Sequence, residues 1–244
     1  MKSYYNLKYP IKAIPFNDES IISWMIRTSF LNGVDPKSLS QSFFNDSVFL
    51  NRDFDRYINP DAIKSILKFT YVSKEEIKQL TLQHLIDKYV NPPFRINKYI
   101  QYQWLRPFTK RAYQTFEGFY YCPLCLKSNS YLKLSWRLRN MISCQEHKIK
   151  LINKCSHCNK IYDPRNNSYT QNSLNICAHC NQDLTNIKVL MTYGNSSNSS
   201  LKSIAKNIKN TNNPKKENKN KNFILHPNSK EKVESLYQEL LNEI

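Results

Sequence analysis

Seven cysteines and one histidine, arranged in two matching sets, constrain the fold of this 244-residue chain more than any other feature. The first set is C-x2-C followed after eighteen residues by C-x2-H, and the second is C-x2-C followed after eighteen residues by C-x2-C. Each member of the second set lies 33 residues after its counterpart in the first, which predicts a tandem duplication of one small unit. The eight residues are Cys122, Cys125, Cys144, His147, Cys155, Cys158, Cys177 and Cys180.

The two sets predict two structural Zn²⁺ ions. A C-x2-C pair places two thiolates on one tight turn, and four Cys or His ligands close a tetrahedral zinc site. A disulfide framework is disfavoured, because seven cysteines leave one unpaired and the first residues do not resemble a secretory leader. Four protein ligands leave no open position on either ion, so a structural metal is expected rather than a hydrolytic one.

The duplication also assigns the histidines. His147 occupies the place that Cys180 fills in the second set, so we expect it to be a ligand. His157 and His179 lie inside the C-x2-C pairs, and we expect them to face solvent. Sequential pairing, with one ion per set, follows most simply from the repeat, and a cross-braced arrangement is the alternative.

The charge of the chain predicts a polyanionic partner. The formal net charge is +17, distributed as +6 over residues 1–121, +7 over 122–190 and +4 over 191–244. Seven thiolates and two Zn²⁺ would lower the total to about +14. A strongly basic balance favours nucleic acid as the partner, and lysine enrichment from an AT-rich coding sequence is the alternative. The sequence has no run of about 20 apolar residues that could cross a membrane, so we expect a cytoplasmic, DNA-associated protein with no membrane partner.

Residues 1–93 are predicted to form a helical domain. Asn17 or Asp18 is expected to cap a first helix, with Glu19 in its first turn and Gly33 at its end. The Asp35-Pro36 step predicts the start of a second helix. Two helices joined by a short glycine-containing turn form a helix-turn-helix unit.

A second helix pair is predicted in the same domain. Asn59-Pro60 marks one helix start, and Ser73 followed three residues later by Glu76 is a capping box that marks another. Most such pairs only pack against each other, so contact with DNA bases is one of two alternatives for both pairs.

Residues 94–121 form a connecting segment with ten aromatic side chains among 28 residues. Basic side chains between them, namely those of Arg106, Lys110 and Arg111, are candidate contacts to nucleic acid or a partner, because interleaved aromatic and basic groups can hold bases and phosphates. The alternative is that aromatic side chains join the metal region to the helical domain. Those side chains are Trp104, Phe108, Phe116 and Phe119.

The tandem zinc-finger region is expected over residues 122–190. Within it, apolar side chains alternate with polar ones from Leu132 to Arg139, which predicts a strand with a basic outer face. Lys133, Arg137 and Arg139 on that face are further candidate contacts to nucleic acid or a partner. A helical face through Tyr131, Leu134, Leu138 and Met141 is the alternative.

After the zinc region the composition changes. Residues 191–228 are rich in Asn, Ser and Lys and predict a flexible basic linker. Residues 229–244 predict a C-terminal amphipathic helix whose apolar stripe needs a partner surface. The expected fold is therefore a mainly α helix-turn-helix domain, two small tandem zinc-finger or zinc-ribbon units, a linker and a final helix.

At several points the sequence resembles the TniQ/TnsD family of transposon proteins. The resemblance covers roughly residues 13–190. It includes I-P-F-N-D-E-S-I-I-S-W-M-I-R with the following N-G, S-K-E-E-I-K-Q-L-T-L, and the run Y-C-P-L-C-L…Y-L-K-L-S-W-R-L…C-x2-H…L-I-N-K-C-x2-C. The family usually has proline after the third zinc ligand and glycine after the histidine, where this chain has Gln145 and Lys148.

The resemblance implies a non-catalytic adaptor that selects target sites in DNA transposition. Family members recruit an AAA+ ATPase that brings the transposase to the chosen DNA, so the ATPase and target DNA are the implied partners. In CRISPR-associated elements, members act as dimers on an RNA-guided effector complex or beside the ATPase filament, which adds that complex and a second copy as candidate partners. A stand-alone zinc-containing helix-turn-helix regulator is the alternative function. An enzyme such as a RING-type ligase or a nuclease is disfavoured by the closed ligand sets.

Overall fold

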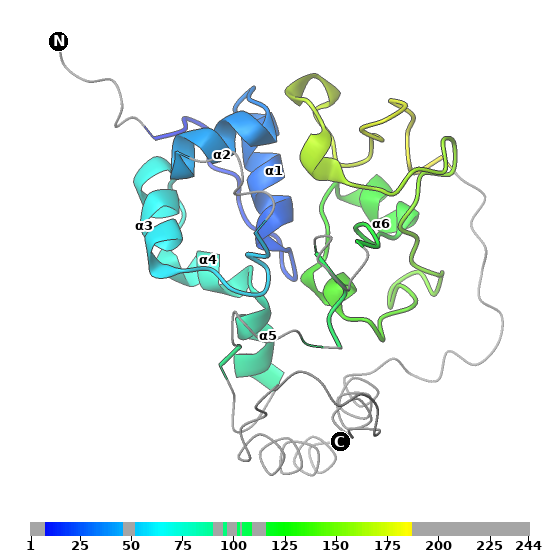
Figure 1. The fold of residues 1–244 in the computed structure, drawn as a ribbon, viewed down its shortest axis with the longest axis horizontal. Coiled ribbons are helices and arrows are strands. Elements are labelled where there is room, and N and C mark those ends of the chain that lie inside the picture. Colours follow the sequence, from blue (N-terminus) through cyan, green and yellow to red (C-terminus); the bar gives the residue numbers. More distant parts are fainter. Residues whose placement is uncertain are drawn as a thin grey trace, which may run out of the picture.

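The computed structural model describes residues 8–45, 52–89, 95–96, 102, 104–108 and 116–186. The helices α1–α5 lie on one side of the molecule, and residues 116–186, here called the ligand region, lie on the other (Figure 1). The predicted linker at 191–228 and the predicted helix at 229–244 lie outside the described residues, as do Lys110 and Arg111.

Two helices form where the first pair is predicted. Helix α1 (Ile21–Leu31) is followed by α2 (Pro36–Phe44), with Asp35 at the N-cap of α2 and proline at its first position. Gly33 has φ of 66°, the left-handed conformation that glycine adopts without steric cost, and it ends α1 as predicted. Nearly all of α1 is buried, including Ile22, Trp24 and Ile26, so α1 is a core helix rather than a surface helix.

The second helix pair also begins where the caps predict. Helix α3 (Pro60–Phe69) is capped by Asn59, whose side chain accepts from Ala62 N–H at 2.7 Å. Helix α4 (Lys74–Gln79) starts with the predicted capping box of Ser73 and Glu76. A further short helix, α5 (Leu82–Tyr89), follows. None of the described helices is long and apolar enough to cross a membrane.

The predicted start of α1 is wrong by two to three residues. Ser20 is the N-cap, and its side chain accepts from Ser23 N–H at 3.1 Å. Asp18 instead has φ of 58° and turns its carboxylate toward Ser135, 117 residues away, whose N–H donates to it at 3.0 Å. Glu19 is buried ahead of the helix and pairs with Arg27 at 2.6 Å. Asp18 is thus engaged by a distant residue, and Ser20 supplies the cap of α1.

The ligand region contains short helices and isolated β-bridges, and no β-strand is formed among its described residues. Helix α6 (Pro123–Ser128) begins directly after Cys122. Three 3₁₀ helices follow, η2 (Leu134–Arg137), η3 (Pro164–Asn166) and η4 (Tyr169–Gln171). The described chain is therefore mainly helical, as predicted.

The predicted strand over residues 132–139 is wrong. The structure has η2 there, with single bridges at Lys133 and Leu138 to either side of it. Leu132, Leu134, Trp136 and Leu138 are all buried, because the 3₁₀ turn lies between the helices and the connecting segment and is covered on several sides. The alternation of apolar and polar residues alone could not reveal that this segment is covered by other parts of the chain on more than one side.

Helix α1 joins the helical part to the ligand region. Leu132 N–H donates to Ser23 Oγ at 2.9 Å, and Ser20 N–H donates to the Leu132 carbonyl at 3.0 Å. Buried apolar side chains from both parts form one continuous hydrophobic core. The predicted packing of the aromatic segment is confirmed for four residues that join this core, Trp104, Phe108, Phe116 and Phe119.

Candidate metal centres

Three of the four ligand turns share one backbone pattern. In each, the backbone N–H of the first cysteine donates to the carbonyl five residues further along the chain, as in Cys144 to Ile149 and Cys155 to Lys160. A single β-bridge closes each turn and joins the residue before the first cysteine to the residue six positions after that cysteine. These bridges are Ser143–Lys150, Lys154–Ile161 and Ile176–Asp183. The repeat in the sequence is thus a repeat in backbone geometry.

The fourth turn is built differently. Cys122 precedes α6, and Cys125 lies in the first turn of that helix. Cys125 N–H donates to Cys122 Sγ at 3.5 Å, so the cysteine side chain caps the helix. The positive end of a helix favours a thiolate at this position.

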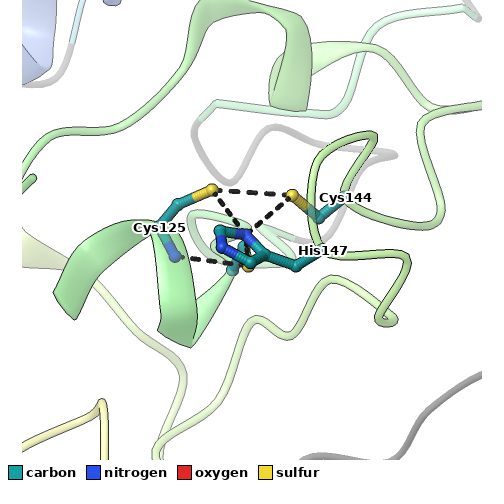
Figure 2. Close-up of side chains that lie close together, drawn as sticks. Cys125, Cys144 and His147 are labelled. Carbon is teal, nitrogen blue, oxygen red and sulfur yellow. Dashed lines mark hydrogen bonds between the residues drawn. The ribbon is translucent and has the colours of Figure 1, made fainter. Parts of the chain in front are cut away.

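The first centre consists of Cys122, Cys125, Cys144 and His147. Their ligand atoms all lie within 4.8 Å of one another, and the cysteines are buried. The imidazole Nδ1 of His147 lies 3.5 Å from Cys122 Sγ, 3.3 Å from Cys125 Sγ and 3.6 Å from Cys144 Sγ. Figure 2 shows Cys125, Cys144 and His147 pointing toward one another.

The second centre consists of Cys155, Cys158, Cys177 and Cys180, again with ligand atoms within 4.8 Å of one another. Cys155 Sγ lies 3.6 Å from Cys180 Sγ, and Cys158 Sγ lies 3.8 Å from Cys177 Sγ. The ligands are therefore grouped sequentially, one centre per repeat, and not cross-braced. His157 and His179 are exposed and belong to neither group, as predicted.

These separations fit a tetrahedral metal ion. Bonds of about 2.3 Å to sulfur and about 2.0 Å to nitrogen hold two sulfurs about 3.8 Å apart and a sulfur and a nitrogen about 3.5 Å apart. A disulfide requires about 2.05 Å between sulfurs, and all seven cysteines are free. The two clusters can therefore hold two metal ions, each with four protein ligands.

The residue after each of the three similar turns has a left-handed backbone. Lys148, Asn159 and Asn181 have φ of 55°, 56° and 57°. Asparagine tolerates this conformation, whereas lysine does so at a steric cost. The position of Lys148 therefore explains on physical grounds why a glycine after the histidine suits this turn.

Glu146 places a carboxylate beside the first centre. The Cys125 thiol donates to Glu146 Oε2 at 3.3 Å, and Lys133 Nζ donates to Glu146 Oε1. The hydrogen bond from Lys133 lowers the pKa of Glu146. An ionised carboxylate next to a cysteine opposes thiolate formation, and the Lys133 ammonium offsets that effect.

The thiols of the second centre differ in acidity. A backbone hydrogen bond from Lys160 lowers the pKa of Cys158 to about 7, whereas burial raises the pKa of Cys177 to about 12. A metal ion that binds four thiolates displaces their protons. Metal binding at this centre is therefore coupled to proton release, to which the buried Cys177 contributes.

Arg137, a predicted surface contact, is buried instead. Its guanidinium donates to Asp53 Oδ1 at 2.9 Å and to Asp55 Oδ2 at 2.8 Å. Only 8% of its side chain is exposed. The expectation that Arg137 projects from a basic outer face is therefore wrong, because two acids from the helical part neutralise it inside the molecule.

Arg106 is also buried, contrary to the prediction of a surface contact. Its Nε donates to the Trp136 carbonyl at 3.1 Å and its Nη2 to the Met141 carbonyl at 2.8 Å. The guanidinium lies 3.5 Å from the centroid of the Tyr120 ring. Burial lowers the pKa of Arg106. Arg106 thus satisfies carbonyl groups of the ligand region inside the fold.

The remaining predicted contacts have different positions. Lys133 has 15% of its side chain exposed, and its ammonium donates to Glu146. Arg139 has 47% of its side chain exposed and donates to Glu117 at 3.4 Å. Of the six predicted contact residues, Arg139 is thus the most exposed among those that the structure describes.

The sequence did not identify the acidic residues that bind the ligand region. Asp18, Asp53 and Asp55 each bind a group of the ligand region more than 80 residues away. A local signal existed only for Asp18, as an acid just before a helix. No spacing rule connects such distant positions, so only the folded chain could reveal these pairs.

Comparison with known families agrees with the resemblance in the sequence. The family model described as TniQ matches residues 10–151. The match covers α1–α6 and all four ligands of the first centre, and it ends before Cys155 of the second. No curated protein matches the chain. Because the matched residues make up more than half of the sequence, this chain belongs to the TniQ family.

Proposed function

We propose that this protein is a non-catalytic adaptor that selects target sites in DNA transposition. Membership of the TniQ family associates the protein with transposition. In the proposed role it links target DNA, or an RNA-guided effector complex, to an AAA+ ATPase, and it acts as a single copy or as a homodimer. The setting is the bacterial cytoplasm, where thiol ligands stay reduced.

One observation carries this proposal. The family match spans both the helical part and the first centre, and these two parts share one hydrophobic core through α1 and Leu132. An adaptor needs a rigid body that presents several surfaces at fixed positions. The shared core supports such a role, because neither part can turn independently without breaking buried contacts.

We propose that both centres hold Zn²⁺ and that the ions are structural. Three thiolates with one imidazole, and four thiolates, are typical zinc ligand sets. Four protein ligands leave no position for a substrate or an activated water, which favours a scaffold over catalysis. In the proposed organisation, the helical domain covers residues 1–93, the connecting segment 94–121 and the zinc-finger region 122–190.

Co-purification tests the adaptor role. The tagged full-length chain is incubated with the AAA+ ATPase encoded by the same element, and with an AAA+ ATPase from an unrelated source as the control. We expect the cognate ATPase to be retained and the unrelated one to wash off. A preparation with two zinc ions per chain that retains neither the cognate ATPase nor a target complex would overturn the proposal.

A stand-alone DNA-binding regulator is the second candidate function, and the exposed face of α2 favours it. Lys37, Ser38 and Gln41 lie on this face as part of a predicted helix-turn-helix, and polar side chains of this kind can reach base edges in the major groove. This function requires tight binding to one DNA sequence without a partner. Selection from a random DNA library combined with the co-purification distinguishes the two candidates, because a regulator recovers a shared motif and retains no ATPase, whereas an adaptor retains the cognate ATPase.

A further inference from the structure

The stretch from the first centre to the second presents lysines on its outer side. Residues 141–162 contain four lysines and a single acid, Glu146, which is held by Lys133. We call Lys150, Lys154 and Lys160 the lysine strip. All three are exposed, and none forms an ion pair with an acid in the described ranges of the chain.

The backbone fixes where these lysines lie. Bridges at alternate residues, Ser143–Lys150, Tyr121–Ile152 and Lys154–Ile161, show that residues 150–154 are extended. Ile149 and Leu151 are buried, so Lys150 and Lys154 lie on the opposite, outer face. At about 3.3 Å per residue, their Cα atoms are about 13 Å apart.

Lys160 extends the strip around the next ligand turn. Its carbonyl accepts from Cys155 N–H at 2.9 Å, which places it across the turn from Lys154. The strip is therefore attached to backbone that both metal centres hold in place. Its positions are defined by paired main chain rather than by a loose loop.

We propose that the lysine strip contacts the phosphate backbone of duplex DNA. Duplex DNA carries one phosphate per 3.4 Å of helix axis on each strand, so lysines whose Cα atoms are about 13 Å apart correspond to about four phosphate intervals along the axis. The strip offers ammonium groups, which neutralise phosphates but do not read bases. It deepens the proposed function by assigning the DNA contact to the ligand region, after Arg106 and Arg137 were found to be buried.

A different role for the same lysines would be to balance the metal centres. A Zn²⁺ ion with three thiolates carries one negative charge, and with four thiolates two. If that were their purpose, removing the lysines would weaken zinc retention and leave DNA binding of the zinc-loaded protein unchanged. The two roles therefore give opposite results in one experiment.

The test measures binding of the full-length, zinc-loaded chain to a labelled duplex of arbitrary sequence between 50 and 200 mM salt. The strip variant carries Lys150→Ala, Lys154→Ala and Lys160→Ala. The control carries Lys8→Ala, Lys12→Ala and Lys64→Ala, three exposed lysines that neither candidate function places on DNA, with the same loss of charge. Zinc content is measured for every sample.

We expect the strip variant to lower the slope of log Kobs against log salt by roughly 2–3, since each phosphate contact contributes about 0.9. The control should retain the wild-type slope. An unchanged slope in the zinc-loaded strip variant would overturn the proposal, and so would an equal decrease of the slope in the control. The proposal would also be overturned if the strip variant lost affinity for single-stranded RNA but not for the duplex. If the triple variant loses zinc, the three single variants replace it, and unchanged slopes in all of them overturn the proposal.

The ATPase assay separates this inference from the adaptor role. The strip variant should still retain the cognate ATPase. If the strip variant retains the ATPase and binds DNA as the wild type does, the proposed DNA contact of the lysine strip is rejected and the adaptor role stands. If the strip variant lowers the slope of log Kobs against log salt but the wild-type protein never retains the ATPase, the DNA contact stands and the adaptor role is rejected.

Discussion

The guanidinium of Arg137 lies between the carboxylates of Asp53 and Asp55. Nη1 donates to Asp55 Oδ2 at 2.8 Å, and Nη2 donates to Asp53 Oδ2 at 2.9 Å. Burial raises the pKa of Asp55, while for Arg137 the two carboxylates outweigh burial and raise the pKa. These ion pairs connect η2 of the ligand region to the segment before α3, so they hold the ligand region against the helical part.

Removing this arginine should destabilise the protein strongly. Arg137→Ala leaves Asp55 buried without its partner, and breaking a buried pair from one side costs about 3–5 kcal/mol. Urea denaturation at saturating zinc measures the change. Arg139→Ala is the matched control, because Arg139 is half-exposed and a surface pair contributes about 0–1 kcal/mol. Equal losses in the two variants would contradict the structural difference between the two arginines.

Two histidines should differ in zinc content. His147→Ala removes a ligand of the first centre and is expected to lower zinc from two ions per chain to one. His157→Ala, which changes an exposed histidine between two ligands of the second centre, should keep both ions. Mass spectrometry under native conditions measures the stoichiometry. Loss of zinc in His157→Ala alone would refute the assigned ligand set.

Glycine should be favourable at one lysine and unfavourable at another. Lys148 has φ of 55°, so Lys148→Gly relieves left-handed strain of about 1–2 kcal/mol, reduced by the greater freedom of glycine in the unfolded chain. Lys150 lies in extended backbone, where glycine costs about 0.5–1 kcal/mol. Thermal unfolding of both variants at saturating zinc gives the sign. A lower melting temperature for Lys148→Gly than for the wild type would count against the turn geometry.

Metal removal should loosen α1 as well as the ligand turns. The N-terminal end of α1 is bonded to Leu132, which lies between two ligands of the first centre. A chelator is therefore expected to speed hydrogen exchange both in residues 122–147 and in the first turn of α1. Helix α3 serves as the internal control, because its N-cap is supplied locally by Asn59. Faster exchange in the ligand turns alone would show that the two parts are not coupled.

Much of the secondary structure followed from local signals. The starts of α3 and α4 were predicted from Asn59 and Ser73, because a capping side chain acts on N–H groups two or three residues away. The start of α2 was predicted from Asp35-Pro36, and the proline at the first helical position carries it, since the Asp35 side chain makes no capping hydrogen bond. The start of α1 was missed for the opposite reason. Asp18 has a partner in Ser135, and no rule based on neighbouring residues includes it.

The surface contacts were the least predictable part. Arg106 and Arg137 have the spacing and charge of surface residues, yet they bind carbonyls and carboxylates inside the fold. Lys150 and Lys154 lie outside because they alternate with the buried Ile149 and Leu151 in extended backbone, and Lys160 is exposed on the next ligand turn. Charge along a sequence therefore does not distinguish a buried cation from an exposed one.

The sequence by itself determined the eight candidate ligands and their repeat, because a ligand turn is built from residues within seven positions of each other. Only the tertiary structure decided how the ligand region joins the helices and which cations remain exposed. Those outcomes depend on pairs such as Asp18 with Ser135 and Asp53 with Arg137, which are more than 80 residues apart and meet only after the core has formed.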